Sequence, residues 1–281
     1  MLQFNGPFRI ITTLGSRVIL PASYTEWLKN CPGLDHQELV HDEYFAAYPG
    51  MEGQKVVTDP RKILIDVTKR KLNQNSSFAI SAMHTTSELL KQALLDICMH
   101  PKLIPDIRYE ASKAVEESGW STAGVFKMRL LDSVVKETQR LKPGSLVNLE
   151  RKALRGVVLP NGMTIPRGTN IAVDSSMMWD PAIYPDPFVY DGYRFLRLRE
   201  SGNTGAALAS SSPEHIAFGI GKPICPSRFF ASNEVKIALA KILLTYDVRL
   251  PEGFKPKVFE MGYEMLSDLG AKLEIRKRSG L

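Results

Sequence analysis

Apolar residues recur every three or four positions through much of the chain, which is the spacing of a helix face buried in a core. One such run covers residues 78–99, and others cover 106–117 and 125–141. Residues 226–246 form the most regular run, and residues 60–74 predict an amphipathic helix rich in basic side chains. These periodicities predict a mainly α protein.

Shorter runs rich in β-branched residues predict small β-sheets in addition. FRIITT and RVIL lie within residues 8–21 around a turn that contains Gly15, and they predict a hairpin. Two further strands are predicted at 156–159 and 170–174, on either side of the turn-rich stretch LPNGMTIPRG. Residues 201–214 are rich in Gly, Ser and Ala and predict a flexible or exposed loop.

Composition excludes several classes of function. The chain has 281 residues, 44% of them hydrophobic, and a formal charge of +6. Lys and Arg are scattered among acidic residues, so nucleic-acid binding is not predicted, whereas an acidic protein partner and a merely solvated surface both stay open. The three cysteines are widely spaced without a CxxC pair, which disfavours a disulfide framework or a zinc site and favours a reducing compartment. No window offers the roughly 20 apolar residues of a membrane span.

One cysteine stands in a setting that favours a metal-bound thiolate. In FGIGKPICPSRFFA, Cys225 precedes Pro226, which suits the first position of a helix and would place the sulfur at the positive end of the helix dipole. Gly219 and Gly221 allow tight turns and the close approach of a flat cofactor. A lone cysteine is more often a core residue, but this pattern favours a ligand. A phosphate-binding loop is excluded because GxxxxGK[ST] is absent.

The same segment resembles the haem-binding loop of the cytochrome P450 family, in which a Phe, a Gly and the ligand Cys recur at this spacing. Phe218, Gly221 and Cys225 occupy these places. The resemblance implies haem b as cofactor, with Cys225 as the axial thiolate ligand of the iron, where it assists cleavage of the O–O bond. It also implies a single domain over residues 1–281 with the cytochrome P450 fold, mainly α with small β-sheets.

Two positions near the cysteine depart from the family. Pro223 stands where an Arg or His usually pairs with a haem propionate, and Ser227 stands where a Gly is usual. Other cations lie where the family places propionate-binding groups, namely Arg151 and, in an earlier helix, Arg70 or Lys69. The resemblance therefore implies a propionate site with one fewer ionic contact.

A further resemblance concerns KETQR, in which Glu137 and Arg140 are three residues apart on one helix face. Alone, such a pair is usually a solvated surface pair. The family carries ExxR at this place, followed by an Arg in a segment like the one around Arg194. The resemblance implies a buried Glu-Arg-Arg triad with a structural role.

SAMHTTS resembles the oxygen-binding stretch of the family. By this resemblance Ala82 leaves room over the iron and Thr85 holds a water that relays protons. His84 occupies the place of the usual acid, and it can also relay protons near neutral pH. The alternative is that the threonines bond to the helix backbone and His84 is a core residue.

Members of this family are considerably longer than the chain. Residues 54–74 resemble the early haem-contacting helix, and residues 75–87 follow at once as the middle of the oxygen-binding helix. The helices between them, which roof the substrate pocket, are expected to be missing, as is the N-terminal membrane anchor. We expect a truncated fold with an internal deletion near residues 73–77.

Two functions of different classes follow. The first is an oxidoreductase, a haem-thiolate monooxygenase that inserts one oxygen atom of O2 into an apolar small molecule, such as a terpenoid or another secondary metabolite. Its electrons would come from NADPH-cytochrome P450 reductase. The second is an inactive remnant that acts as a haem-binding or interaction fragment. Thr85 favours a monooxygenase over thiolate-haem isomerases, which often lack a threonine at this place. Full-length relatives are proteins of the endoplasmic reticulum membrane, and for this chain no location is predicted.

Overall fold

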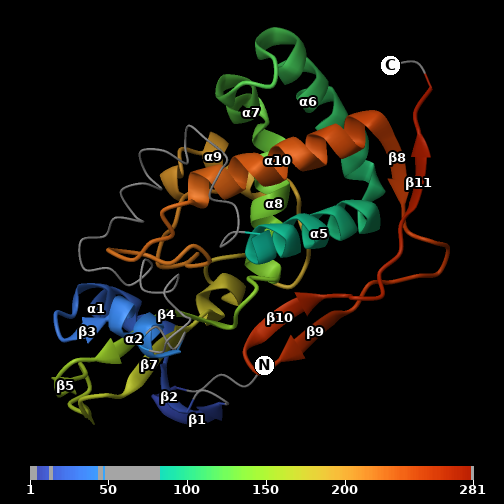
Figure 1. Cartoon of the computed structure of the whole chain (residues 1–281). Helices are drawn as coiled ribbons and strands as arrows, with labels where there is room; N and C mark the ends of the chain where they lie inside the picture. The colour runs from blue at the N-terminus through green and yellow to red at the C-terminus, as the bar shows by residue number, and fades with distance from the viewer. Residues whose placement is uncertain (1–4, 13–14, 44–46, 48–82, 280–281) are drawn as a thin grey trace. The chain divides into compact units, whose positions relative to one another are not determined.

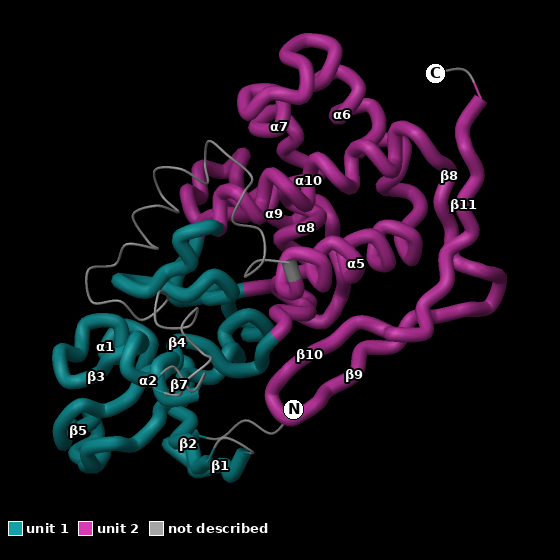
Figure 2. Tube along the Cα trace, in the orientation of Figure 1, with its two compact units in different colours: residues 1–77, 145–183, 211–227 teal, residues 78–144, 184–210, 228–281 magenta. Residues whose placement is uncertain are grey.

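The computed structural model describes residues 5–12, 15–43, 47 and 83–279 (Figure 1). The chain divides into two compact units, and each of them is assembled from segments that are distant in sequence (Figure 2). Unit 1 comprises residues 1–77, 145–183 and 211–227; unit 2 comprises residues 78–144, 184–210 and 228–281.

Unit 1 is built on a five-stranded sheet with the order β1-β2-β7-β4-β3. Its strands are β1 (Phe8–Thr12), β2 (Gly15–Leu20), β3 (Leu34–Asp35), β4 (Val147–Ala153) and β7 (Asn170–Asp174). β1 and β2 form the predicted antiparallel hairpin, whereas β2 pairs in parallel with β7. Ile19, Leu20 and Val173 are at most 1% exposed, so the middle of the sheet forms the core of this unit.

Helices and a small hairpin complete unit 1. The helical elements are η1 (Ala22–Tyr24), α1 (Thr25–Asn30), α2 (His36–Glu43) and η4 (Ser176–Trp179). The predicted strand at 156–159 is present as β5 (Val157–Val158), which pairs with β6 (Thr164–Ile165). β4, against which α2 packs, was not predicted from the sequence.

β4 is irregular next to Arg151, one of the buried arginines in the described part of unit 1. The register with β7 shifts between Asn148 and Arg151, and Leu149 has a φ of 55°. A positive φ at a bulky residue costs about 1–3 kcal/mol. Burial nevertheless alternates along the whole strand, with Leu149 and Arg151 buried and Glu150 between them half-buried.

Unit 2 is mainly helical. Its helices are α5 (Met83–Met99), η3 (Pro101–Leu103), α6 (Ile104–Ser118), α7 (Thr122–Lys127), α8 (Arg129–Leu141), α9 (Arg194–Glu200), η5 (Thr204–Ala206) and α10 (Arg228–Thr245). α8 is buried along almost its whole length, and it packs against α5, α9 and α10 (Figure 1). Two antiparallel pairs follow α10: β8 (Tyr246–Arg249) with β11 (Glu274–Lys277), and β9 (Val258–Met261) with β10 (Glu264–Ser267).

The helix predicted for residues 125–141 is two helices in the structure. Met128 has a ψ of 72° and separates α7 from α8. Ser121 begins α7 as its N-cap and accepts a hydrogen bond from the Gly124 amide at 3.2 Å. The helix predicted for 106–117 is confirmed as α6, and the described part of the 78–99 helix is α5. The helix predicted for residues 60–74 lies outside the described residues.

Residues 201–214 were predicted to be a flexible or exposed loop, and in the structure only residues 201–204 are exposed. Ala206 and Leu208 are 3% and 0% exposed. The Leu208 amide donates to Asp132 at 2.7 Å, and Nζ of Lys136 donates to the carbonyls of Ala207 and Ser210, both at 2.8 Å. Polar partners on α8 therefore hold this loop against the core, which its composition did not show. None of the helices within the described ranges combines the length and hydropathy of a membrane span.

Candidate functional site

The loop before Cys225 is closed by backbone hydrogen bonds. The Cys225 amide donates to the Phe218 carbonyl at 2.8 Å, and the Ile224 amide donates to the Gly221 carbonyl at 3.2 Å. Cys225 is half-buried and is a thiol that forms no disulfide with either of the other two cysteines. The loop therefore presents one sulfur at the end of a folded turn.

Two glycines in this loop adopt conformations that other residues rarely do. Gly219 has a φ of 71° and Gly221 a φ of 79°. A Cβ atom on Gly221 would lie 2.7 Å from Cγ of Lys29, whereas the nearest atom to a Cβ on Gly219 is 3.5 Å away. The tight turns expected from the sequence are thus present, and at Gly221 the Lys29 side chain of helix α1 occupies the space that a side chain would need.

The predicted start of the helix after the cysteine was wrong. Pro226 and Ser227 form a turn, and α10 begins at Arg228, so Pro226 is not at the first helical position. The helix dipole acts mainly within the terminal turn. Its effect on a Cys225 thiolate is therefore smaller than the sequence predicted.

In unit 2 the structure brings together Glu137, Arg140 and Arg194. The Glu137 carboxylate accepts hydrogen bonds from Arg140 at 2.8 and 2.9 Å and from Nε of Arg194 at 3.1 Å. The Glu137 and Arg140 side chains are 0% exposed. The Arg194 guanidinium also donates to the carbonyls of Pro185 at 2.7 Å and Val189 at 3.2 Å. Every charge in this cluster thus has a charged partner, which burial demands.

Arg151 has the features of a residue that binds an anion. It is 5% exposed, and its Nη1 donates to the Glu150 carbonyl at 2.7 Å. Its Nη2 is buried and has no hydrogen-bond partner within the described part of the chain. Burial lowers the pKa of this guanidinium to about 10. A buried cation with an unused donor is costly without an anion, so this residue fits a haem propionate.

The residues expected above the iron are only partly described. His84 and Thr85 lie in the first turn of α5, and both side chains are exposed. The alternative that His84 is a core residue is therefore wrong. Ala82, Arg70 and Lys69 lie outside the described residues.

Sequence reasoning missed an ionic network beside Arg151. The Arg17 guanidinium is 2% exposed and forms ion pairs with Glu43 and Glu150, while His36 Nδ1 lies 2.9 Å from the Glu150 carbonyl oxygen. These residues come from β2, α2 and β4. The alternation of apolar and polar residues in VNLERKA could have predicted β4. No local signal in the sequence predicts that Arg17 pairs with Glu43 and Glu150, because these residues are far apart along the chain.

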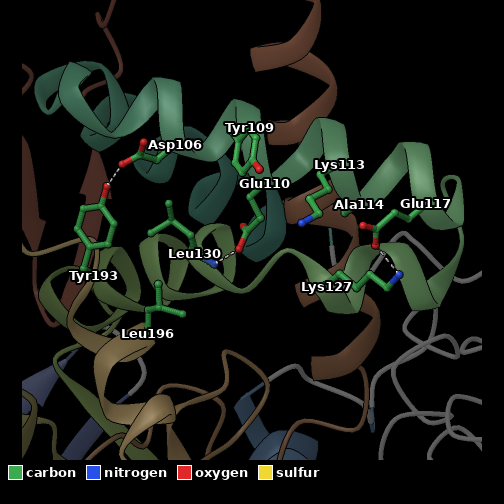
Figure 3. Close-up of a pocket in the computed structure, with 10 residues that line it drawn as sticks. All are labelled: Asp106, Tyr109, Glu110, Lys113, Ala114, Glu117, Lys127, Leu130, Tyr193 and Leu196. Atoms are coloured by element: carbon green, nitrogen blue, oxygen red, sulfur yellow. Dashed lines mark hydrogen bonds and ion pairs between the residues drawn. The ribbon is translucent and has the colours of Figure 1, made fainter.

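Unit 2 also has a surface groove of about 470 Å³ lined by α6 and by residues of the α7, α8 and α9 region (Figure 3). The acidic groups in it already have partners: Asp106 with Tyr193, Glu110 with the Leu130 amide, and Glu117 with Lys127. No unsatisfied buried polar atom of the described chain lies among its lining residues. The groove thus has no feature that points to a ligand.

Comparison with known proteins gives a consistent result. The model of the cytochrome P450 family matches residues 66–273. Cytochrome P450 monooxygenase ntnM of Nectria sp is 44% identical over 206 residues, which cover 73% of this chain and 40% of ntnM. Cytochrome P450 monooxygenase trt6 of Aspergillus terreus is 45% identical over 207 residues, covering 72% and 42%. Cytochrome P450 monooxygenase esdpI of Penicillium shearii is 44% identical over 202 residues, covering 71% and 39%.

The chain belongs to the cytochrome P450 family. Its mixture of helices with small sheets agrees with a truncated form of that fold. The matched segment corresponds to about two fifths of the length of these relatives.

Proposed function

We propose that the chain binds haem b through Cys225 and that the whole protein is a haem-thiolate monooxygenase. The observation that carries the proposal is the Phe218–Cys225 loop, in which two glycines of positive φ and the Cys225 amide bond present one thiol. Bound haem supplies the activation of O2. Relatives named as monooxygenases favour this function over an inactive remnant.

The other site residues have distinct proposed roles. Phe218 and Gly221 shape the loop, while Arg151, together with Arg70 or Lys69, binds the propionates. Glu137, Arg140 and Arg194 hold the helical core, because each charge is buried against its partner. Thr85 and His84, beside Ala82, are the proposed proton relay.

We further propose a class of substrate, an electron donor and a domain organisation. The substrate is an apolar small molecule, such as a terpenoid or another secondary metabolite, and the electron donor is NADPH-cytochrome P450 reductase. The chain forms a single cytochrome P450 domain with an internal deletion near residues 73–77. Sequencing the transcript across codons 73–78 tests the deletion, because an unspliced block that encodes further helices would show that the longer protein exists.

Haem ligation is tested by the spectrum of the reduced, CO-bound protein. The 281-residue chain reconstituted with haem is expected to show a Soret band at the thiolate position, and Cys225→Ala is expected to abolish it. Cys31→Ala is the matched control, since Cys31 is also a half-buried thiol of unit 1. A thiolate band that persists in Cys225→Ala, or failure of the chain to take up haem, contradicts the proposal.

A further inference from the structure

The Glu150 carbonyl oxygen is shared by two side chains. His36 Nδ1 lies 2.9 Å from it, and Arg151 Nη1 donates to it at 2.7 Å. His36 is the first residue of α2, whereas Glu150 and Arg151 belong to β4, and all three lie in unit 1. The imidazole and the guanidinium are therefore neighbours held on one acceptor.

The carboxylates near Arg151 are already engaged. Glu43 and Glu150 both pair with Arg17, and Asp35 accepts a hydrogen bond from the Glu38 amide at 2.8 Å. Arg151 Nη2 is left buried and without a partner among the described residues. A fixed guanidinium with an unused amino group is the arrangement that binds a carboxylate from outside the chain.

The backbone holds these groups in place. Leu149 has a φ of 55° at the register shift in β4, immediately before Glu150 and Arg151. Residues in such conformations persist where the surrounding structure fixes them, and they cluster at ligand-binding sites. The bulge thus lies directly beside the residue that supplies the shared carbonyl and the residue that carries the unsatisfied guanidinium.

The protonation state of His36 decides what its other ring nitrogen can do. In neutral His36 the contact with the Glu150 carbonyl requires the proton on Nδ1, so Nε2 carries a lone pair. Burial lowers the pKa of His36, the hydrogen bond to Glu150 opposes that shift, and the Arg151 charge lowers the pKa further. A neutral His36 would repel a carboxylate at Nε2, whereas a protonated one would donate to it.

We propose that His36 and Arg151 form a two-residue site for one haem propionate, and that His36 takes up a proton when the haem binds. This inference rests on the proposed binding of haem by the chain. Asp35, Glu43 and Glu150 already face the cluster against the charges of Arg17 and Arg151. A further carboxylate adds negative charge, which a proton on His36 offsets.

The proton uptake is measured by NMR titration of His36 in the 281-residue chain, with its ring signal assigned by its loss in His36→Gln. Zinc protoporphyrin, which is diamagnetic and carries both propionates, is expected to raise the pKa of His36. Its dimethyl ester, which lacks the carboxylates, is expected to leave that pKa as in the ligand-free chain. A rise with excess acetate but none with zinc protoporphyrin would show a free-carboxylate site and overturn the propionate assignment.

Haem affinity provides the second measurement. The ratio of the dissociation constant of haem dimethyl ester to that of haem removes effects common to both ligands, including the state of Cys225. In the unmodified chain this ratio is expected to rise at least several-fold as the pH falls from about 8 to about 6, the range in which histidine titrates. In His36→Gln it is expected to be nearly constant with pH. His41→Gln, a change of a partly exposed histidine on the same helix, is the matched control.

The outcomes separate this inference from the proposed function. If the chain binds haem through Cys225 but the ratio of dissociation constants depends on pH in His36→Gln as it does in the unmodified chain, only the inference fails. If the chain binds neither haem nor zinc protoporphyrin, both fail. Should His36→Gln fold poorly, His36→Asn gives a second uncharged variant for the same ratio.

Discussion

The Glu137 carboxylate accepts two hydrogen bonds from the Arg140 guanidinium, at 2.8 and 2.9 Å, with both side chains fully buried in α8. Arg194 donates to the same carboxylate from the first residue of α9. One carboxylate therefore joins two arginines from two helices. Its removal leaves both of them in the core without a carboxylate to share.

Glu137→Gln is expected to lower the free energy of unfolding by roughly 3–5 kcal/mol, the range for breaking a buried ion pair from one side. Gln keeps the size of the side chain but removes the charge that compensates Arg140 and Arg194. Urea unfolding followed by circular dichroism measures the effect. Glu117→Gln is the control, because the Glu117–Lys127 pair is exposed and should shift the midpoint far less. Equal shifts in the two variants would show that the buried triad stabilises the fold no more than the exposed Glu117–Lys127 pair does.

Lys136 is expected to make stability depend on pH in the alkaline range. Burial lowers its pKa from 10.5 to about 7, and Asp132 only partly opposes this shift. Between these values the unfolded chain holds the proton and the folded chain does not, so stability rises with pH, by up to about 1.4 kcal/mol per unit. Below about pH 7 both states are protonated, and this contribution becomes constant.

Lys136→Met removes this titration, so its free energy of unfolding should lack that rise between about pH 7 and pH 10.5. Urea unfolding at several pH values measures how the free energy of unfolding changes with pH in Lys136→Met and in the unmodified chain. The exposed Lys113→Met serves as control and should parallel the unmodified chain. Parallel slopes for Lys136→Met and the unmodified chain would show that Lys136 stays protonated in the fold.

Gly221→Ala is expected to weaken haem binding more than Gly219→Ala. Both positions have a positive φ, which costs an alanine about 1 kcal/mol or more. At Gly221 the new Cβ would also meet Lys29 Cγ at 2.7 Å, so the Lys29 side chain, α1 or the loop must shift. Absorbance titration with haem gives the two dissociation constants. Equal affinities would show that Lys29 moves aside and that contact with α1 does not shape the loop.

The sequence predicted those parts of the fold whose signals are local. The 106–117 periodicity predicted α6 because an amphipathic helix needs only its own residues to show its buried face. Likewise, the β-branched runs around Gly15 predicted the β1–β2 hairpin. Residues 125–141 kept the same periodicity across Met128, so the pattern could not reveal the break between α7 and α8.

Tertiary contacts account for the features that the sequence did not predict. Leu208 is buried because Asp132 and Lys136, on α8, supply partners for its loop, and composition alone made that loop look exposed. For the candidate site, the glycines and Cys225 could be found from one short segment. His36 could not be found in this way, because its relation to Arg151 exists only after α2 packs on β4.

The parallel pairing of β2 with β7, with Leu20 opposite Val173, fixes the order in which unit 1 is completed during synthesis. β2 leaves the ribosome before β7, which emerges later by roughly 8–30 s at usual elongation rates. Until then the inner edge of β2 has no strand to pair with, and such an edge readily joins other chains. The nascent chain is therefore most vulnerable to aggregation while the residues between β2 and β7 are being made, and a chaperone that covers the β1–β2 hairpin would act in that interval.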